Sequence, residues 1–310
     1  MQASGVLLQD PSDQMRLELH DRVFKKLSLF GVPYQVHDFE CVDYALHEVA
    51  PDLPLYRGPG VPEKALAAGD YFCVVGAAQT FGRLVREPWA NRISEAIDLP
   101  VLNLSGAGFG PEVFLNEKIL ELLHGARFIV LQMMSGRSVG CDEYPGGRRI
   151  TLNDKTTGVH RLDILKDMWQ KDPGVALHYI RKWNANYLEV YRQLHERIKR
   201  PTLLLWIGER KPEDWAPEDV ITKPTWGAFP QLVGRDLFEQ VSAIFAERYE
   251  HSTEPEVEAT YSRITGKPCP YFAQRKGTST SFKYYPSTNS HQMLAKALTP
   301  WALDARKQSA

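Results

Sequence analysis

Cysteine is scarce in this chain, and its few cysteines are widely scattered. The sequence contains no CxxC motif, no Cys/His pairing at zinc spacing, and no HxH or HxxxH pair among its nine histidines. We therefore expect neither a disulfide framework nor a metal site, and a reducing compartment is favoured. Cys73, which lies inside an apolar segment, is most simply a small core residue. The four cysteines are Cys41, Cys73, Cys141 and Cys269.

An excess of one charge and long apolar runs are also missing. The 37 basic and 38 acidic residues give a net charge of −1, which predicts no nucleic-acid partner. The longest apolar runs, such as Phe128–Leu131 and Leu203–Ile207, are strand-sized, so no membrane span is predicted. The N-terminus lacks a basic segment followed by a long apolar stretch, so we expect a cytoplasmic protein without a signal peptide.

Nucleotide-binding motifs are absent as well. The P-loop pattern GxxxxGK[ST] does not occur. The glycines at 106, 108 and 110 follow the spacing GxGxG and not GxGxxG, and the next predicted strand ends in Met133-Met134-Ser135 without an acidic residue. We therefore predict that the protein uses no cofactor.

The 310 residues suit one large domain or two modest ones. We expect an N-terminal extension over 1–69, partly helical and partly irregular, followed by a main domain over 70–310. The segment 209–285 holds many aromatics and prolines and is a candidate cap over the main domain. An amphipathic helix is predicted over 12–30, with its apolar positions at Met15, Leu19, Val23, Leu27 and Phe30.

From residue 70 onward, short apolar strands alternate with amphipathic helices. Continuous apolar strands separated by helices indicate a parallel sheet that is covered on both faces. The expected fold class is α/β, a three-layer sandwich with about five parallel strands. Strands are predicted at 71–75, 101–104, 128–133 and 202–207, and helices at 88–97, 111–123, 175–199, 234–249 and 287–299.

The segment Tyr71–Arg83, YFCVVGAAQTFGR, leads from a strand directly into a tight turn. It resembles the first block, Gly-Asp-Ser-x-Thr-x-Gly, of the SGNH (GDSL-like) family of esterases and acyltransferases. Ala77 stands in place of the Asp and Ala78 in place of the nucleophilic Ser. The resemblance implies a cleft at the carboxyl ends of the strands. The matching positions are Gly76, Thr80 and Gly82.

The segment NLSGAGFGP resembles the second block of the same family. Asn103 and Leu104 match, and Ser105 replaces the usual glycine. The resemblance makes Gly108 the equivalent of the glycine whose backbone N–H helps to form the oxyanion hole. Such a hole requires backbone donors that are fixed where negative charge develops.

The third and last blocks of the resemblance are incomplete. With Gly136 as the third-block glycine, Ser138 and Val139 take the positions of the family's Asn and Asp. His291 stands where the family has its general base, and Thr288 replaces the Asp three residues before it. A hydroxyl can orient an imidazole but cannot stabilise its cation as a carboxylate does.

The chain is also similar to an uncharacterised bacterial subgroup of this family. The similarity rests on the segment Arg57-Gly58-Pro59, the corner GxxxTxGR, and an aromatic-Pro-Ser stretch before the last His, here Tyr285-Pro286-Ser287. No activity follows from this similarity.

Two residues are candidates for catalysis. Thr80 is either a replacement nucleophile or a structural residue that caps the following helix, and His291 is either its base or a histidine bonded to backbone. Cys141 is an alternative thiol nucleophile. Five further residues lie near predicted strand ends and are candidates for ligand binding, with arginine as an anion ligand. They are Gln79, Ser105, Gly108, Ser135 and Arg137, the last in a loop that also holds Arg148 and Arg149.

The predicted helix at 175–199 carries aromatic residues at helical spacing. Trp183 and Tyr187 fall on its core-facing stripe. Tyr179 and Tyr191 flank that stripe and could stack on sugar rings.

The sequence leaves three functions open. The first is a protein without the usual Ser nucleophile that binds a polar ligand, such as a glycan, in the cleft. The second is a carbohydrate O-acyl esterase or acyltransferase that uses His291 with a displaced nucleophile. The third is a structural or assembly protein on the same fold.

Overall fold

A computed structural model defines the fold. Two sequence-based expectations fall outside the residues it describes, namely the helix at 12–30 and the thiol of Cys141, and so do Arg148 and Arg149. No helix among the described residues is long and apolar enough to cross a membrane. The structure describes residues 38–39, 41–106, 108–139, 161–213, 228–253, 260–263, 265–267 and 284–308.

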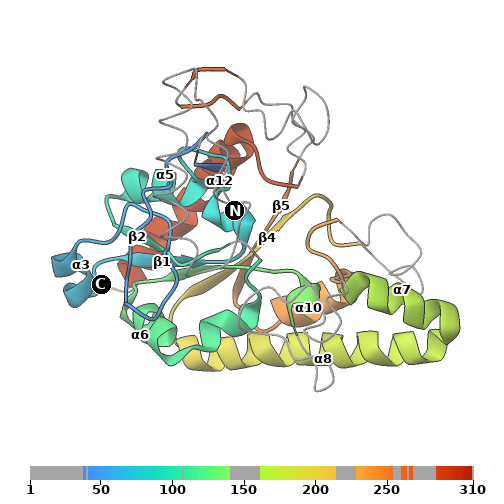
Figure 1. Ribbon diagram of the computed structural model, residues 1–310. Coiled ribbons are helices and arrows are strands. Elements are labelled where there is room, and N and C mark those ends of the chain that lie inside the picture. The colour runs from blue at the N-terminus through green and yellow to red at the C-terminus, as the bar shows by residue number, and fades with distance from the viewer. Residues whose placement is uncertain are drawn as a thin grey trace, which may run out of the picture.

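Five parallel strands form one sheet in the order β2-β1-β3-β4-β5, which confirms the predicted fold class (Figure 1). Strand β1 lies between β2 and β3, so the chain reverses its direction of travel across the sheet at β1. Ligands of open α/β sheets bind at such a point, beyond the carboxyl ends of the strands. The strands are β1 (Phe72–Val75), β2 (Val101–Asn103), β3 (Ile129–Gln132), β4 (Thr202–Gly208) and β5 (Glu247–Ser252).

Helices cover both faces of the sheet. Side chains of β1 alternate between the two faces because successive residues of a strand point in opposite directions. Phe72 and Val74 pack in a core with α5 (Trp89–Ile97) and α12 (Thr288–Gln308). Cys73 and Val75 pack in a second core with three helices of the other layer (Figure 1). These helices are α6 (Glu117–Gly125), α8 (Pro173–Ile198) and α10 (Arg235–Ser242).

The described fold contains further elements. Helix α3 (Glu63–Ala68) precedes β1, and α7 (Arg161–Lys171) packs along α8. Asp172 caps the start of α8, because its Oδ1 atom accepts the N–H of Gly174 at 2.8 Å. The turn η2 (Gly136–Ser138) follows β3.

The predicted helix at 234–249 is wrong in its second half. Helix α10 ends at Ser242, and Glu247–Ser252 forms β5. The segment ERYEHS is mostly charged and polar, because β5 is the edge strand of the sheet and most of its residues are half-buried or exposed. It therefore lacks the apolar run that identifies the other four strands.

Two further helices differ from their predicted bounds. The predicted helix at 111–123 divides into the 3-10 turn η1 (Pro111–Leu115) and α6. Asn116 separates them, because its Oδ1 atom accepts the N–H groups of Lys118 and Ile119 and so caps a new helix. The last helix, α12, continues beyond residue 299 to Gln308 and contains Pro300.

Two tyrosines of α8 hold the backbone at the end of β3. The Tyr187 hydroxyl donates to the Met134 carbonyl at 2.5 Å, and the Met134 N–H donates to the Tyr191 hydroxyl at 2.9 Å. Both side chains are buried, as is Trp183. The core assignment of Trp183 and Tyr187 is confirmed, whereas Tyr191 as a sugar-stacking surface is wrong because its ring is enclosed in the core.

Replacing Tyr191 by Phe should lower the free energy of unfolding by about 1–3 kcal/mol, because the buried Met134 N–H loses its acceptor. The matched control is Tyr261→Phe, at an exposed ring, which should stay within about 0.5 kcal/mol of wild type. Urea denaturation measures both values. Equal stability of the two variants would mean that the Met134 N–H finds another acceptor.

Candidate functional site

The corner after β1 is built around the side chain of Gln132, the last residue of β3. Its Oε1 atom accepts the Ala77 N–H at 2.9 Å, the Thr80 N–H at 3.3 Å and the Thr80 hydroxyl at 2.7 Å. Only glycine fits at position 76, because a Cβ atom there would lie 2.4 Å from Oε1 of Gln132. The short helix α4 (Ala78–Phe81) follows directly.

Thr80 is bonded to the ends of the two strands that flank β1. Its hydroxyl donates to Gln132 at the end of β3, and its carbonyl accepts from Nδ2 of Asn103 at the end of β2, at 3.2 Å. Asn103 in turn accepts the Ser105 N–H at 3.1 Å. Thr80 therefore joins strands together through its hydroxyl and its carbonyl, and no hydrogen bond links the hydroxyl to His291 among the described residues.

Three buried polar atoms around this corner have no hydrogen-bond partner within the part of the chain that the structure describes. They are Oε1 of Gln79, Oγ of Ser105 and Nε2 of Gln132. Each comes from the carboxyl end of a different strand, β1, β2 or β3. We call Gln79, Thr80, Asn103, Ser105 and Gln132 the polar cluster. Such unsatisfied groups are rare in folded proteins and lower stability.

The remaining predicted ligand residues lie in the loops after β2 and β3. Gly108 has φ +67°, a left-handed conformation that favours glycine. Ser135 is buried, and its carbonyl accepts the Ser138 N–H at 3.1 Å. The backbone of Arg137 lies in η2, and its side chain is outside the described structure. Of the five candidate ligand residues, Gln79 and Ser105 therefore belong to the polar cluster.

His291 is buried in the first turn of α12, where it faces the start of α5. Its Nδ1 atom accepts the backbone N–H of Trp89 at 3.0 Å, and its Nε2 atom has no partner among the described residues. Burial, together with the nearby positive groups of Arg57, His251 and Arg92, lowers the pKa of the imidazole to about 3. The ring is therefore neutral at ordinary pH.

The bond to Trp89 also fixes the tautomer of His291. A nitrogen that accepts a hydrogen bond carries no proton, so the single proton of the neutral ring lies on Nε2. In a hydrolytic triad, Nδ1 carries the proton and Nε2 offers the lone pair that takes the proton of the nucleophile. The ring of His291 has the opposite arrangement.

Arg57, from the RGP segment, holds the loop that follows the corner. Its guanidinium is buried and donates to the carbonyls of Gly82 at 2.9 Å and of Val85 and Arg86 at 2.7 Å, with a longer contact of 3.4 Å to Phe81. Burial lowers its pKa to about 10, so it stays charged. The next residue must be glycine, because a Cβ atom at 58 would lie 2.2 Å from a backbone oxygen.

Arg83 connects this loop to two distant segments. Its Nε and Nη2 atoms donate to the Asp38 carboxylate at 2.7 and 2.9 Å, in a buried ion pair. Its Nη1 atom donates to the Tyr285 hydroxyl at 2.5 Å. The arginine of the GxxxTxGR corner therefore joins the segment around Asp38, the corner and the segment before α12.

Sequence reasoning missed Gln132, which was read as part of an apolar strand. Its signal is the one amide in the run FIVLQMM, a polar side chain that burial forces to find partners. It also missed Asp38, whose role depends on a contact across 45 positions of the chain. No group of three metal-ligating side chains occurs in the described ranges.

A family model described as "Domain of unknown function (DUF6473)" matches residues 37–144, the segment that holds Arg57 and the polar cluster. No curated protein matches the sequence.

Several solved structures of esterases and lipases are similar in chain path at low sequence identity. The lipase Lip_vut3 from a goat rumen metagenome is 14% identical, with a TM-score of 0.38 over 75% of this chain and 96% of that one. A family two carbohydrate esterase from Clostridium thermocellum, in complex with cellohexaose, is 9% identical, with a TM-score of 0.38 over 81% and 66%. A putative lipolytic protein of the G-D-S-L family from Desulfitobacterium hafniense DCB-2 is 8% identical, with a TM-score of 0.33 over 74% and 98%.

Replacing Arg57 by Met should lower the free energy of unfolding by more than about 3 kcal/mol, because several buried carbonyls lose their donor together. The control is Arg181→Met at an exposed position of α8, expected within about 0.5 kcal/mol of wild type. Urea denaturation followed by circular dichroism gives both values. A loss as small as that of the control would show that Arg57 does not hold the loop.

The neutral state of His291 predicts a specific pH dependence of stability. Its folded pKa is lowered to about 3, so between about pH 6.5 and 3 the unfolded chain binds a proton that the folded chain does not, and stability falls as pH falls. In His291→Asn, the amide oxygen can accept the Trp89 N–H and does not titrate. Between pH 7.5 and 5.0, wild type should lose about 2 kcal/mol more than this variant.

Urea denaturation at the two pH values tests this, with His178→Asn at an exposed position as the control. The control should lose as much stability as wild type. If His291→Asn also follows wild type, the imidazole takes up a proton in the folded protein and its neutral assignment is wrong.

Proposed function

We propose that this protein is a non-hydrolytic member of the SGNH-like class that binds an uncharged polar ligand, such as a glycan, at the carboxyl ends of β1, β2 and β3. The observation that carries the proposal is the hydrogen bond from the Trp89 N–H to Nδ1 of His291. This bond places the proton of the neutral ring on Nε2, where a general base needs its lone pair.

The chemistry of the corner supports the same conclusion. Ala77 and Ala78 offer no nucleophile at the position where the related family has its serine. The Thr80 hydroxyl, the alternative nucleophile, donates its proton to Gln132. The N–H groups of Ala77 and Thr80 are both bonded to the same amide oxygen of Gln132, so neither is available to stabilise an oxyanion.

The polar cluster suits a neutral ligand. It offers an acceptor from Gln79, a donor from Gln132 and a hydroxyl from Ser105 that can act as either. None of its members carries a charge. Sugar hydroxyls both donate and accept, so their chemistry matches all three groups, which gives a reason for the retention of these groups despite the loss in stability.

The test compares Ser105→Ala with wild type. Since Oγ of Ser105 has no described partner, the variant should be as stable as wild type or more stable. On an array of neutral and acidic glycans followed by titration calorimetry with the bound glycan, wild type should bind and Ser105→Ala should bind about tenfold more weakly. The matched control is Ser242→Ala, another buried hydroxyl without a described partner, which should bind as wild type does.

Two outcomes would contradict the proposal. Hydrolysis of p-nitrophenyl acetate that disappears in His291→Ala would favour an esterase or acyltransferase with a displaced nucleophile, and Thr80→Ala would then test that hydroxyl. No binding to any glycan, together with no hydrolysis, would favour a structural or assembly protein.

A further inference from the structure

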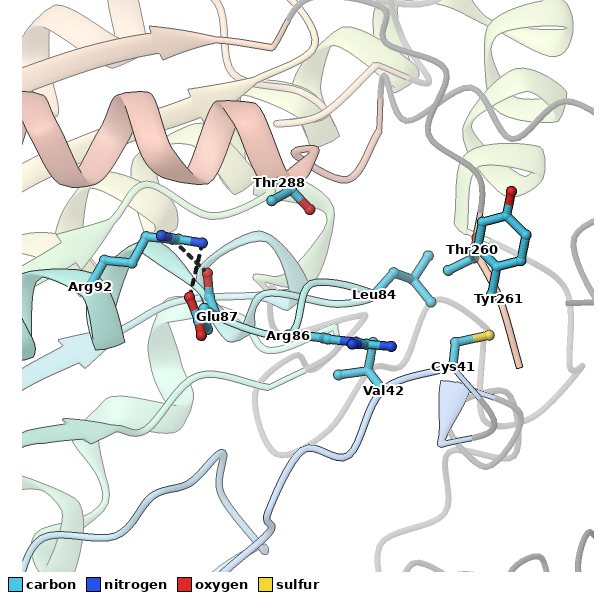
Figure 2. Close-up of a pocket in the computed structure, with 9 residues that line it drawn as sticks. All are labelled: Cys41, Val42, Leu84, Arg86, Glu87, Arg92, Thr260, Tyr261 and Thr288. Atoms are coloured by element: carbon cyan, nitrogen blue, oxygen red, sulfur yellow. Dashed lines mark hydrogen bonds and ion pairs between the residues drawn. The ribbon is translucent and has the colours of Figure 1, made fainter. Parts of the chain in front are cut away.

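A separate pocket opens beside the loop that Arg57 holds. Its volume is about 420 Å³, within the range of small-molecule sites. The loop between α4 and α5 forms one side of the pocket. The first residue of α12 forms another, and residues 260–261 form a third (Figure 2). The lining residues are Cys41, Val42, Leu84, Arg86, Glu87, Arg92, Thr260, Tyr261 and Thr288.

The conformation of the loop is what presents its side chains to this pocket. Arg57 donates hydrogen bonds to the carbonyls of Val85 and Arg86, and the Arg86 side chain lies in the pocket (Figure 2). Leu84 has φ +68°, a left-handed conformation that is unfavourable for a leucine. Strain of this kind persists where surrounding contacts impose it, and it is concentrated at functional sites.

The charges of the pocket favour an anion. Arg86 has no ion-pair partner among the described residues. Arg92 pairs with Glu87 at 3.1 Å, and this pair is partly exposed, so an incoming anion can compete for Arg92. Two arginines and one glutamate leave the lining with a formal charge of +1. The buried hydroxyl of Thr260 has no partner in the described ranges and adds a neutral hydrogen-bonding group.

We propose that this pocket binds the carboxylate or phosphate group of a small, sugar-sized molecule. The planar guanidinium of Arg86 can bind two oxygens of such a group at once. Arg92 supplies a second positive charge, and Thr260 a further hydrogen bond. The proposal does not depend on the function of the polar cluster.

The pocket and the polar cluster lie on different parts of the same two segments. In the segment between β1 and α5, Gln79 belongs to the polar cluster and Leu84 lines the pocket. Before α12, the Tyr284 carbonyl accepts from Gln79 at 3.2 Å, whereas Thr288 lines the pocket. Ser105→Ala should therefore leave anion binding unchanged, which separates the two proposals experimentally.

Titration calorimetry with four probes tests the proposal: D-glucuronate, glucose 6-phosphate, inorganic phosphate and D-glucose. We expect saturable binding of at least one anion, weaker at higher ionic strength, and no binding of glucose at this site. The probe that binds identifies the group as carboxylate or phosphate. Absence of saturable binding by all three anions would overturn the proposal.

Two variants with opposite effects locate the site. Arg86→Gln should weaken anion binding by at least about tenfold, because it removes charge-assisted hydrogen bonds. Glu87→Gln should strengthen binding by about two- to fivefold, because it releases Arg92 from its ion pair. Both residues are exposed, so neither change should affect folding, which thermal unfolding verifies.

The matched control is Arg181→Gln, an exposed arginine of α8 that does not line the pocket. It removes the same charge and should bind as wild type does. If Arg86→Gln and Arg181→Gln weaken binding equally, the anion responds to the overall charge of the protein and the site is refuted. Weaker binding by Glu87→Gln would likewise overturn the role of Arg92.

Discussion

The loop between α4 and α5, which lines the pocket, takes its shape from one buried guanidinium. Arg57 donates to carbonyls of the loop between α4 and α5, and its charge is solvated by those carbonyls and by the face of the Tyr44 ring, 4.7 Å away. The loop therefore does not follow its own turn preferences: Leu84 is left-handed, and its N–H is bonded to the Tyr44 hydroxyl. Arg210 acts similarly after β4, where it donates to the carbonyls of Pro230 and Val233 at 2.8 and 2.7 Å. Buried arginines thus shape two loops at the carboxyl edge of the sheet.

A second constraint comes from amide and imidazole groups that burial forces into fixed roles. Gln132 uses one oxygen for three donors, which closes the corner without any charged group. His291 accepts the first N–H of α5, which would otherwise be an unsatisfied donor at a buried helix start. In each case a polar side chain supplies the hydrogen-bond acceptor that a buried backbone N–H requires. The other polar atom of each side chain is left without a described partner.

The fold could be predicted from the sequence where burial produces an apolar run. Four strands were found because both of their faces are covered, whereas β5 was missed because an edge strand needs no such run. The candidate site could be predicted only in part. The family resemblance identified Thr80 and His291 as candidate catalytic residues. It does not specify which ring nitrogen of His291 is hydrogen-bonded. That depends on Trp89, 202 residues away in the chain, and on the packing of α12 against α5. The roles of Gln132 and Asp38 are long-range for the same reason.

The alanine at position 78 is by itself a weak argument about function, since a hydroxyl elsewhere can take over the role of a serine. The tautomer of His291 is a stronger argument, because it does not depend on which residue attacks. A serine at position 78 would supply an oxygen, and it would still find Nε2 protonated as long as the Trp89 N–H is bonded to Nδ1. Freeing Nδ1 would require another acceptor at the start of α5, a helix that packs along α12 in the core. The same contact that completes the fold therefore places the ring proton on the nitrogen that a general base would need free.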